Sequence, residues 1–236
     1  MSAMVFSTPR SRTRSAPAVN SCDNPARSKP TQNEPLHTIT PQNQMTCWKP
    51  HSRFPRSRIP ADLSDWLLDR ESLTLRLQQL CPGKSSRGFR VRVLSQTREL
   101  PRLDETQVLG MQPREMAVIR QVLLMCGRQP WIYARTVIPV TSLRGKLQRL
   151  TSLGTRPLGG VLFADPGMHR GVVELAEILP GQALFAAATV HLRQQPGVIW
   201  GRRSVFRLSG KPLLVSEIFL PDFPAASPLP PCWRND

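Results

Sequence analysis

Two pairs of strand-like segments, each joined by a short turn, constrain the fold of this chain more than any other feature of its sequence. The segments and their turns are residues 115–126 and 131–139 around 127–130, and residues 202–208 and 212–220 around 209–211. Apolar runs that are separated only by such turns predict β-hairpins, whose two strands are antiparallel. The sheet is therefore expected to be mainly antiparallel.

Helical spacing of apolar residues predicts an amphipathic helix over 61–80 and a second helix over 141–154. A short helix is predicted from Pro157, because proline is tolerated at the first helical position. Further strands are predicted at 89–93 and at 171–178. This order of elements predicts an α+β fold, with helices packed on one side of a single, mainly antiparallel β-sheet.

Basic residues are concentrated near the N-terminus. The chain carries 32 lysine and arginine residues against 16 aspartate and glutamate residues, a formal net charge of +16. Nine of the basic residues fall within 1–60, where proline is frequent and no periodic apolar pattern occurs. Such a segment buries too little apolar surface to offset its ordering entropy, so residues 1–58 are predicted to be a disordered basic extension. A folded domain is predicted over 59–222 and a proline-rich tail over 223–236.

Several classes of protein are excluded by what the sequence lacks. No apolar run approaches the roughly 18 residues of a membrane span, so no membrane insertion is expected. The five cysteines are scattered without a CxxC pair, which predicts no disulfide framework and is typical of a reducing cytoplasm. The histidines form no metal-ligand pattern, and no glycine-rich nucleotide fingerprint is present, so neither a metal nor a nucleotide cofactor is expected. Since no DNA-binding or RNA-binding motif occurs, a nucleic-acid partner is not expected either.

Two charged residues occupy otherwise apolar strand faces. Arg120 shares its predicted face with four apolar residues, and Glu217 shares its face with three. Burying either charge alone is costly, so each requires an opposite charge or a polar ligand. A buried arginine offers paired donors to a carboxylate, and a buried glutamate can accept from a hydroxyl or take a proton. From the pattern alone, a ligand site, a structural salt bridge between the two, and solvated faces all stay open.

Other arginines are secondary candidates. Arg135 shares a predicted face with Tyr133 and Val137, where it is either a second anion contact or an ordinary edge-strand residue. Arg202 and Arg203 form a short basic cluster at the start of a strand. This cluster fits either a phosphate or carboxylate contact or a solvated strand end.

Four stretches, taken in order, resemble the chorismate pyruvate-lyase family. They are Trp66-Leu67-Leu68 with Ser72, Pro130-Trp131 with Arg135 to Val140, Leu153 to Gly159, and Trp200 to Pro221. The similarity covers residues 61–221, and the ordered set is more specific than any one stretch. Residues 176–199 depart from the family pattern, because part of this stretch has no counterpart in the short bacterial form of the family. A surface loop or helix is expected there.

The resemblance implies an enzyme that converts chorismate to 4-hydroxybenzoate and pyruvate at the entrance to ubiquinone biosynthesis. It also implies an antiparallel sheet with helices on one side and the ligand enclosed beneath helical flaps. The substrate-binding pattern of the family falls on Arg120 and Glu217. It falls also on Leu158 and on Leu73, where the contact is through the main chain.

The chemistry of chorismate suits these residues. Loss of the enolpyruvyl ether and of one ring proton makes the ring aromatic, so no metal, flavin or nicotinamide is required. We expect Arg120 to pair with the ring carboxylate, and Glu217 to bind the ring hydroxyl and act as the catalytic base. Arg135 or Arg203 is expected to receive the enolpyruvyl carboxylate. The sequence thus predicts a cytoplasmic, monomeric lyase whose partner is its small-molecule substrate.

Two other functions are compatible with the sequence. The first is a non-catalytic module that binds small acids, as in the effector-sensing domains of some transcription regulators, which share a similar fold. Those chains carry an N-terminal winged helix, whereas residues 1–60 are too rich in proline to form one. The second is a basic RNA-associated protein with a disordered arm, which would lose most of its RNA affinity if residues 1–58 were deleted.

Overall fold

The structure, a computed structural model, describes residues 45–81 and 88–225. Most of the extension expected at 1–58 and most of the tail expected at 223–236 lie outside these residues. In the described part, eight strands form one sheet, and every strand pair is antiparallel. The predicted α+β class with a single antiparallel sheet is confirmed. No helix in this part of the chain combines the length and the apolar character needed to cross a membrane.

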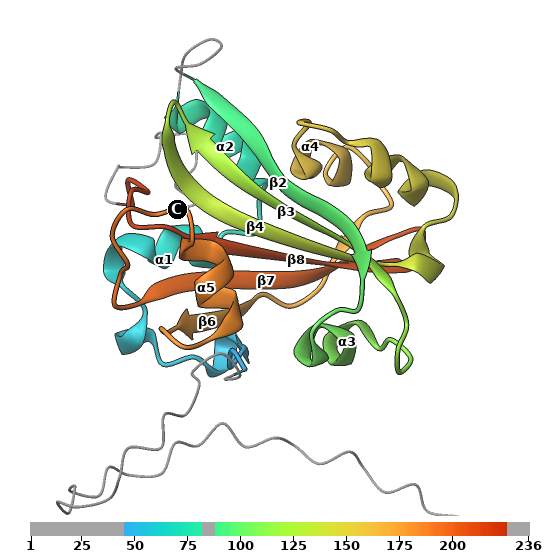
Figure 1. The fold of residues 1–236 in the computed structure, drawn as a ribbon, viewed down its shortest axis with the longest axis horizontal. Coiled ribbons are helices and arrows are strands. Elements are labelled where there is room, and N and C mark those ends of the chain that lie inside the picture. The colour runs from blue at the N-terminus through green and yellow to red at the C-terminus, as the bar shows by residue number, and fades with distance from the viewer. Residues whose placement is uncertain (1–44, 82–87, 226–236) are drawn as a thin grey trace, which may run out of the picture. The chain divides into compact units, whose positions relative to one another are not determined.

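The sheet follows the order β1-β6-β7-β8-β4-β3-β2, and β5 also pairs with β7 (Figure 1). The strands are β1 Lys49–Pro50, β2 Phe89–Glu99, β3 Ala117–Cys126, β4 Gln129–Pro139, β5 His169–Arg170, β6 Glu174–Ile178, β7 Ile199–Leu208 and β8 Lys211–Phe219. Both predicted hairpins are present, since β3 pairs with β4 and β7 pairs with β8. The two hairpins meet through β4 and β8, so the segments with the strongest strand pattern form the middle of the sheet.

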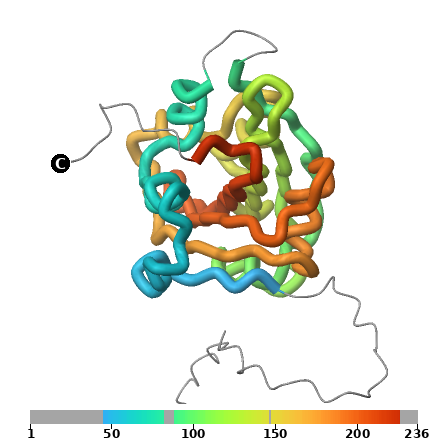
Figure 2. The backbone as a smooth tube through the Cα atoms, turned by 90° about the vertical axis from the view of Figure 1, so that its left-hand side faces the viewer, coloured from blue at the N-terminus to red at the C-terminus, as the bar shows by residue number. Residues whose placement is uncertain are grey.

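Helices lie against both faces of this sheet, which corrects the expectation that they pack on one side only. They are α1 Ala61–Leu68, α2 Leu73–Leu80, α3 Leu103–Leu109, α4 Leu158–Leu162 and α5 Ala183–Thr189, with 3-10 helices η2 His51–Arg53, η3 Arg56–Arg58, η5 Val140–Ser142 and η6 Gly145–Ser152. The layer formed by α1, α2 and α4 covers the face that carries Val122 and Val215. The short helices α3 and α5 pack on the other face, against Val137 and Tyr133 respectively. Figure 2 shows α1 and α2 (cyan) and α5 (orange) on opposite sides of β8 (red).

The single helix predicted over 61–80 is divided in two. The connection between α1 and α2 includes Asp69, whose backbone is extended with φ −59° and ψ 135°. The break leaves the carbonyl groups of Trp66 and Asp69 available, and both accept hydrogen bonds from Arg202. Apolar spacing does not reveal the break, because α1 and α2 pack on the same core cluster.

Other elements also differ from the prediction. The stretch 141–154 contains 3-10 helix, and its Gly145 has a positive φ of 59°, a conformation that glycine adopts without strain. The helix α4 begins at Leu158, so Pro157 precedes the helix instead of opening it. The helix α3 was not predicted. The departure at 176–199 contains α5, in agreement with the expected loop or helix.

The folded part extends beyond the predicted limits of 59 and 222. At the N-terminal side, β1 pairs with β6, and the ring of Trp48 lies 4.7 Å from the guanidinium carbon of Arg203. At the C-terminal side, Phe223 is buried and its ring centre is 4.9 Å from that of Trp66. Residues 45–58 and Phe223 therefore belong to the packed domain, because aromatic side chains from both ends contribute to its packing.

A disulfide joins Cys81 to Cys126, which corrects the expectation that the cysteines are not cross-linked. Cys81 follows α2 and Cys126 ends β3, and their Cα atoms are 5.7 Å apart across a sequence separation of 45 residues. Spacing along the chain did not reveal this pair, because the packing of α2 on the sheet is what brings the two positions together.

Candidate active site

A cavity lies between the sheet and the helices α2 and α4. Four residues expected from the resemblance line it together, namely Arg120 on β3, Glu217 on β8, Leu73 on α2 and Leu158 on α4. The rest of its wall is mainly apolar and includes Val91, Val122, Leu124, Ala134, Leu162, Phe163, Phe206 and Val215. Charges in such a wall interact strongly with a bound ligand, because little water screens them.

Arg120 is 3% exposed and has no carboxylate partner within the described residues. Its Nη1 donates to Gln96 Oε1 at 3.1 Å, and its Nη2 donates to the carbonyl oxygen of Gly154 at 2.8 Å. Burial lowers the pKa of the guanidinium, which indicates a cation without a compensating charge. An arginine has five N–H donors, so Arg120 retains donors for a ligand.

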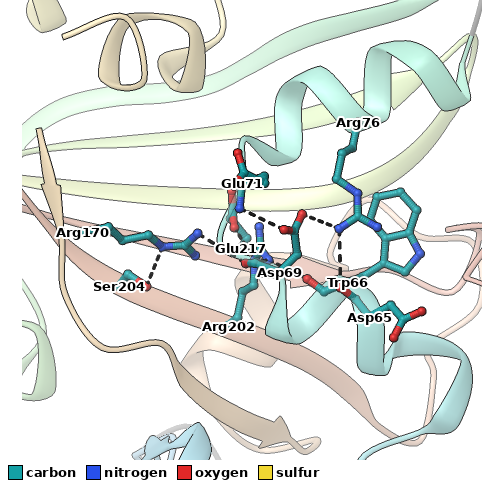
Figure 3. A network of polar contacts seen from close by, with 9 residues as sticks. All are labelled: Asp65, Trp66, Asp69, Glu71, Arg76, Arg170, Arg202, Ser204 and Glu217. Atoms are coloured by element: carbon teal, nitrogen blue, oxygen red, sulfur yellow. Dashed lines mark hydrogen bonds and ion pairs between the residues drawn. The ribbon is translucent and has the colours of Figure 1, made fainter. Parts of the chain in front are cut away.

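Glu217 pairs with Arg202, which excludes the alternative of a structural salt bridge between Glu217 and Arg120. The two are directly opposite across β7 and β8, and Arg202 Nε donates to Glu217 Oε2 at 2.7 Å (Figure 3). Arg202 Nη1 also donates to the carbonyl oxygens of Trp66 at 2.5 Å and Asp69 at 2.7 Å. Arg202 is 1% exposed and held by these contacts, so it fixes the orientation of the Glu217 carboxylate. The other oxygen, Oε1, makes no hydrogen bond to any residue within 45–81 and 88–225.

The backbone amides of Leu73 and Leu158 are the first of α2 and α4, and neither helix has a side-chain hydrogen bond at its N-cap. The first N–H groups of a helix lack intrahelical acceptors, so they are suited to a carboxylate oxygen supplied by a ligand. The two helices approach closely. A Cβ added to Gly159 would lie only 2.9 Å from Thr74 Oγ1. Glycine at this position therefore allows both amides to line one cavity.

Arg135 lies on the opposite face of the sheet, contrary to the prediction that it contacts substrate. Its Nε and Nη2 donate to the two carboxylate oxygens of Glu105 at 2.7 and 3.0 Å, and both side chains are buried. Burial alone would lower the pKa of Arg135, but the hydrogen bonds and charge of Glu105 outweigh this effect and raise it. The pair joins β4 to α3 and leaves Arg135 no role in the cavity.

The Arg135–Glu105 pair predicts a variant that loses stability without losing ligand affinity. Arg135→Met leaves the Glu105 carboxylate buried and unpaired, which is expected to lower the free energy of unfolding by about 3–5 kcal/mol. Urea unfolding measures this change, and titration with 4-hydroxybenzoate, the product that the family resemblance implies, should give a Kd within about twofold of the parent value. A large rise in Kd with an unchanged free energy of unfolding would instead indicate that Arg135 contacts the ligand.

Arg203 also faces away from the cavity, contrary to the expectation that it receives a substrate carboxylate. It donates to Glu174 and to Asp104, each at 2.7 Å, on the face opposite to Arg202. Adjacent residues of a strand point to opposite faces, so the basic pair predicted as one cluster is divided between two faces. Neither arginine forms a solvated strand end, because both are buried.

Arg170 is a cavity residue that the sequence did not reveal. It belongs to β5, and its Nε donates to Ser204 Oγ at 3.2 Å while its Nη1 donates to the Asp69 carbonyl at 3.3 Å (Figure 3). The two-residue strand β5 is too short to show an alternating pattern. Only its pairing with β7 places Arg170 at the cavity.

The fold and the cavity define an α+β protein with a partly enclosed site suited to an acidic ligand. The family model described as chorismate lyase matches residues 42–225. The probable chorismate pyruvate-lyase of Methylobacillus flagellatus is 42% identical over 156 residues, which cover 66% of this chain and 85% of that protein. The corresponding protein of Aromatoleum aromaticum is 41% identical over 180 residues, 73% of this chain and 95% of that protein.

The chain belongs to the chorismate lyase family, because the family model spans most of its length. Among solved structures, a GntR-family transcriptional regulator from Bacillus cereus has a TM-score of 0.43 and 14% sequence identity, covering 57% of this chain and 92% of that one.

Proposed function

We propose that this protein is a chorismate pyruvate-lyase that forms 4-hydroxybenzoate and pyruvate for ubiquinone biosynthesis. The observation that carries the proposal is the cavity in which the buried cation Arg120 and the oriented carboxylate Glu217 are set in a mainly apolar wall. Membership of the chorismate lyase family supports the same reaction. We expect a cytoplasmic monomer that requires neither a metal nor an organic cofactor.

The reaction is an elimination that ends in an aromatic ring. The bond between the ring carbon and the ether oxygen breaks, and its electron pair leaves with the enolpyruvyl group. The ring carbon that bears the hydroxyl loses its proton, and the electrons of that C–H bond complete the aromatic ring. The enolpyruvate then takes up a proton at carbon and becomes pyruvate. Aromatisation drives the reaction, so the protein has to bind the dianion, exclude water and assist the proton transfer.

The cavity residues have distinct roles in this scheme. Arg120 pairs with the ring carboxylate, and the amides of Leu73 and Leu158 add backbone donors to it. Glu217 Oε1 accepts the hydrogen bond of the ring hydroxyl and lies beside the carbon that loses its proton. Arg202 is a positioning residue, because it contacts Glu217 and the α1–α2 connection.

Incubation of the purified protein with chorismate tests the proposal. We expect ultraviolet detection to show 4-hydroxybenzoate, and a coupled lactate dehydrogenase assay to show one pyruvate for each 4-hydroxybenzoate. Inclusion of EDTA should leave the rate unchanged. Binding of chorismate without turnover would contradict the proposal and support the alternative of a non-catalytic module that binds small acids.

A further inference from the structure

A second arginine, Arg170, lines the cavity without a carboxylate partner. Its guanidinium donates to two neutral acceptors, Ser204 Oγ and the Asp69 carbonyl, and lies 5.3 Å from the ring centre of Phe206. No carboxylate within the described residues is at ion-pair distance from it. Burial, and then the positive charge of Arg202, lower the pKa of Arg170 to about 10. At neutral pH it is therefore a cation whose charge a bound anion would stabilise.

The charges around Arg170 leave it available to a ligand. Arg202 is neutralised by Glu217, and the Asp69 carboxylate is engaged by Arg76. Glu71 also lines the cavity, but its side chain is exposed. In the part of the chain that the structure describes, the cavity thus presents two arginines without direct carboxylate partners, Arg120 and Arg170, and chorismate carries two carboxylates.

The two arginines approach the cavity from different sides. Arg120 is on β3 and Arg170 on β5, and the sheet order places β8, with Glu217, between these two strands. Figure 3 shows the guanidinium of Arg170 directed toward Glu217. A ligand held by both arginines would therefore lie across Glu217. This arrangement fits a ring whose carboxylate lies at Arg120 and whose hydroxyl lies at Glu217. The ether-linked carboxylate then lies beyond Glu217, on the side of Arg170.

The surface next to Arg170 is also basic. Arg170 lines a second, outer cavity, whose other polar side chains are His51, Arg70 and His169. No acidic side chain of the described residues lines this outer cavity. The positive charges at the Arg170 end therefore favour a small anion both while it is bound in the site and while it leaves.

We propose that Arg170 binds the enolpyruvyl carboxylate of chorismate and stabilises the negative charge that develops on the departing enolpyruvate. This inference rests on the proposed lyase function. As the ether bond breaks, its electron pair passes to the ether oxygen, so the leaving group gains charge beside a carboxylate that Arg170 already neutralises. Arg170 therefore acts on the half of the substrate that is absent from 4-hydroxybenzoate, whereas Arg120 acts on the half that remains.

Two stable ligands test this assignment by equilibrium binding. They are 3-(carboxymethoxy)-4-hydroxybenzoate, which carries the second carboxylate, and 3-ethoxy-4-hydroxybenzoate, which has a similar ether but no second charge. The parent protein should bind the first compound about tenfold more tightly or better, as expected for a charge-assisted contact. Arg170→Met should abolish this preference. Arg207→Met should keep it, because Arg207 is an exposed arginine of β7 that does not line the cavity.

Turnover supplies the second readout. Arg170→Met is expected to lower kcat/KM for chorismate by about 10–100-fold while the Kd for 4-hydroxybenzoate stays within about twofold. Arg170→Lys should restore part of the lost rate, since it returns the charge without the planar fork. An unchanged kcat/KM in Arg170→Met, or an equal loss of affinity for both test ligands, overturns the inference. Absence of turnover in the parent protein would instead overturn the proposed function.

Discussion

Glu217→Gln is expected to lower kcat for chorismate by about 10²–10⁴-fold, the range that general-base assistance usually contributes. Glutamine keeps the shape of the side chain and can accept a hydrogen bond from the ring hydroxyl, but it cannot take the ring proton. The KM should therefore change much less than kcat. Steady-state kinetics at saturating chorismate measures the effect.

A matched control for this variant is Glu177→Gln on β6. Glu177 forms an ion pair with Arg58 outside the cavity, so its replacement should leave kcat unchanged. A thermal unfolding curve for each variant separates lost chemistry from lost folding. If Glu217→Gln folds and retains the parent kcat, Glu217 is not the base, and its role is confined to binding.

Arg120→Met is expected to lower kcat/KM by about 10²–10³-fold, because a buried arginine that pairs with a carboxylate contributes charge-assisted hydrogen bonds. The Kd for 4-hydroxybenzoate should rise by a similar factor, since the ring carboxylate is present in both substrate and product. This joint loss distinguishes Arg120 from Arg170, whose replacement should spare the product. Isothermal titration with 4-hydroxybenzoate provides the comparison.

Arg207→Met again serves as the control for removal of a positive charge. Arg120 also bonds to Gln96 and to the Gly154 carbonyl, so the free energy of unfolding of Arg120→Met has to be measured alongside the affinity. A well-folded Arg120→Met variant with the parent affinity for 4-hydroxybenzoate would remove Arg120 from the site.

Two residues that the sequence pattern singled out line the candidate site. Arg120 and Glu217 stood out because each is a charge on an apolar strand face, a pattern that persists whatever the exact strand limits are. The structure places both on the same face of the sheet and in one cavity. The pattern could not assign Arg202 to Glu217, because that pairing depends on the register of β7 against β8.

Arg135 and Arg203 were wrongly predicted to contact the ligand. Period-two alternation tells which residues of one strand share a face, but it does not tell which face borders the cavity. That choice depends on the packing of α3 and α5, and α3 carries Glu105, which pairs with Arg135. Because α3 was not predicted, the buried partner of Arg135 could not be anticipated.

The limits of the folded part were mispredicted for a related reason. Residues 45–58 are basic and rich in proline, yet Trp48 in this stretch packs over Arg203. The average composition of such a segment does not reveal that one aromatic side chain packs it against the domain. Likewise, the break at Asp69 provides the carbonyl oxygen that Arg202 and Arg170 share, and apolar periodicity carries no signal for it.

A crystal structure of the protein with 4-hydroxybenzoate tests most directly the claim that this cavity orients the ring between Arg120 and Glu217. In this crystal structure we expect the carboxylate to lie within hydrogen-bond distance of Arg120 and of the Leu73 and Leu158 amides. We also expect the hydroxyl to lie within hydrogen-bond distance of Glu217 Oε1. A ligand bound in the reverse orientation, or outside this cavity, would contradict the proposed roles of Arg120 and Glu217.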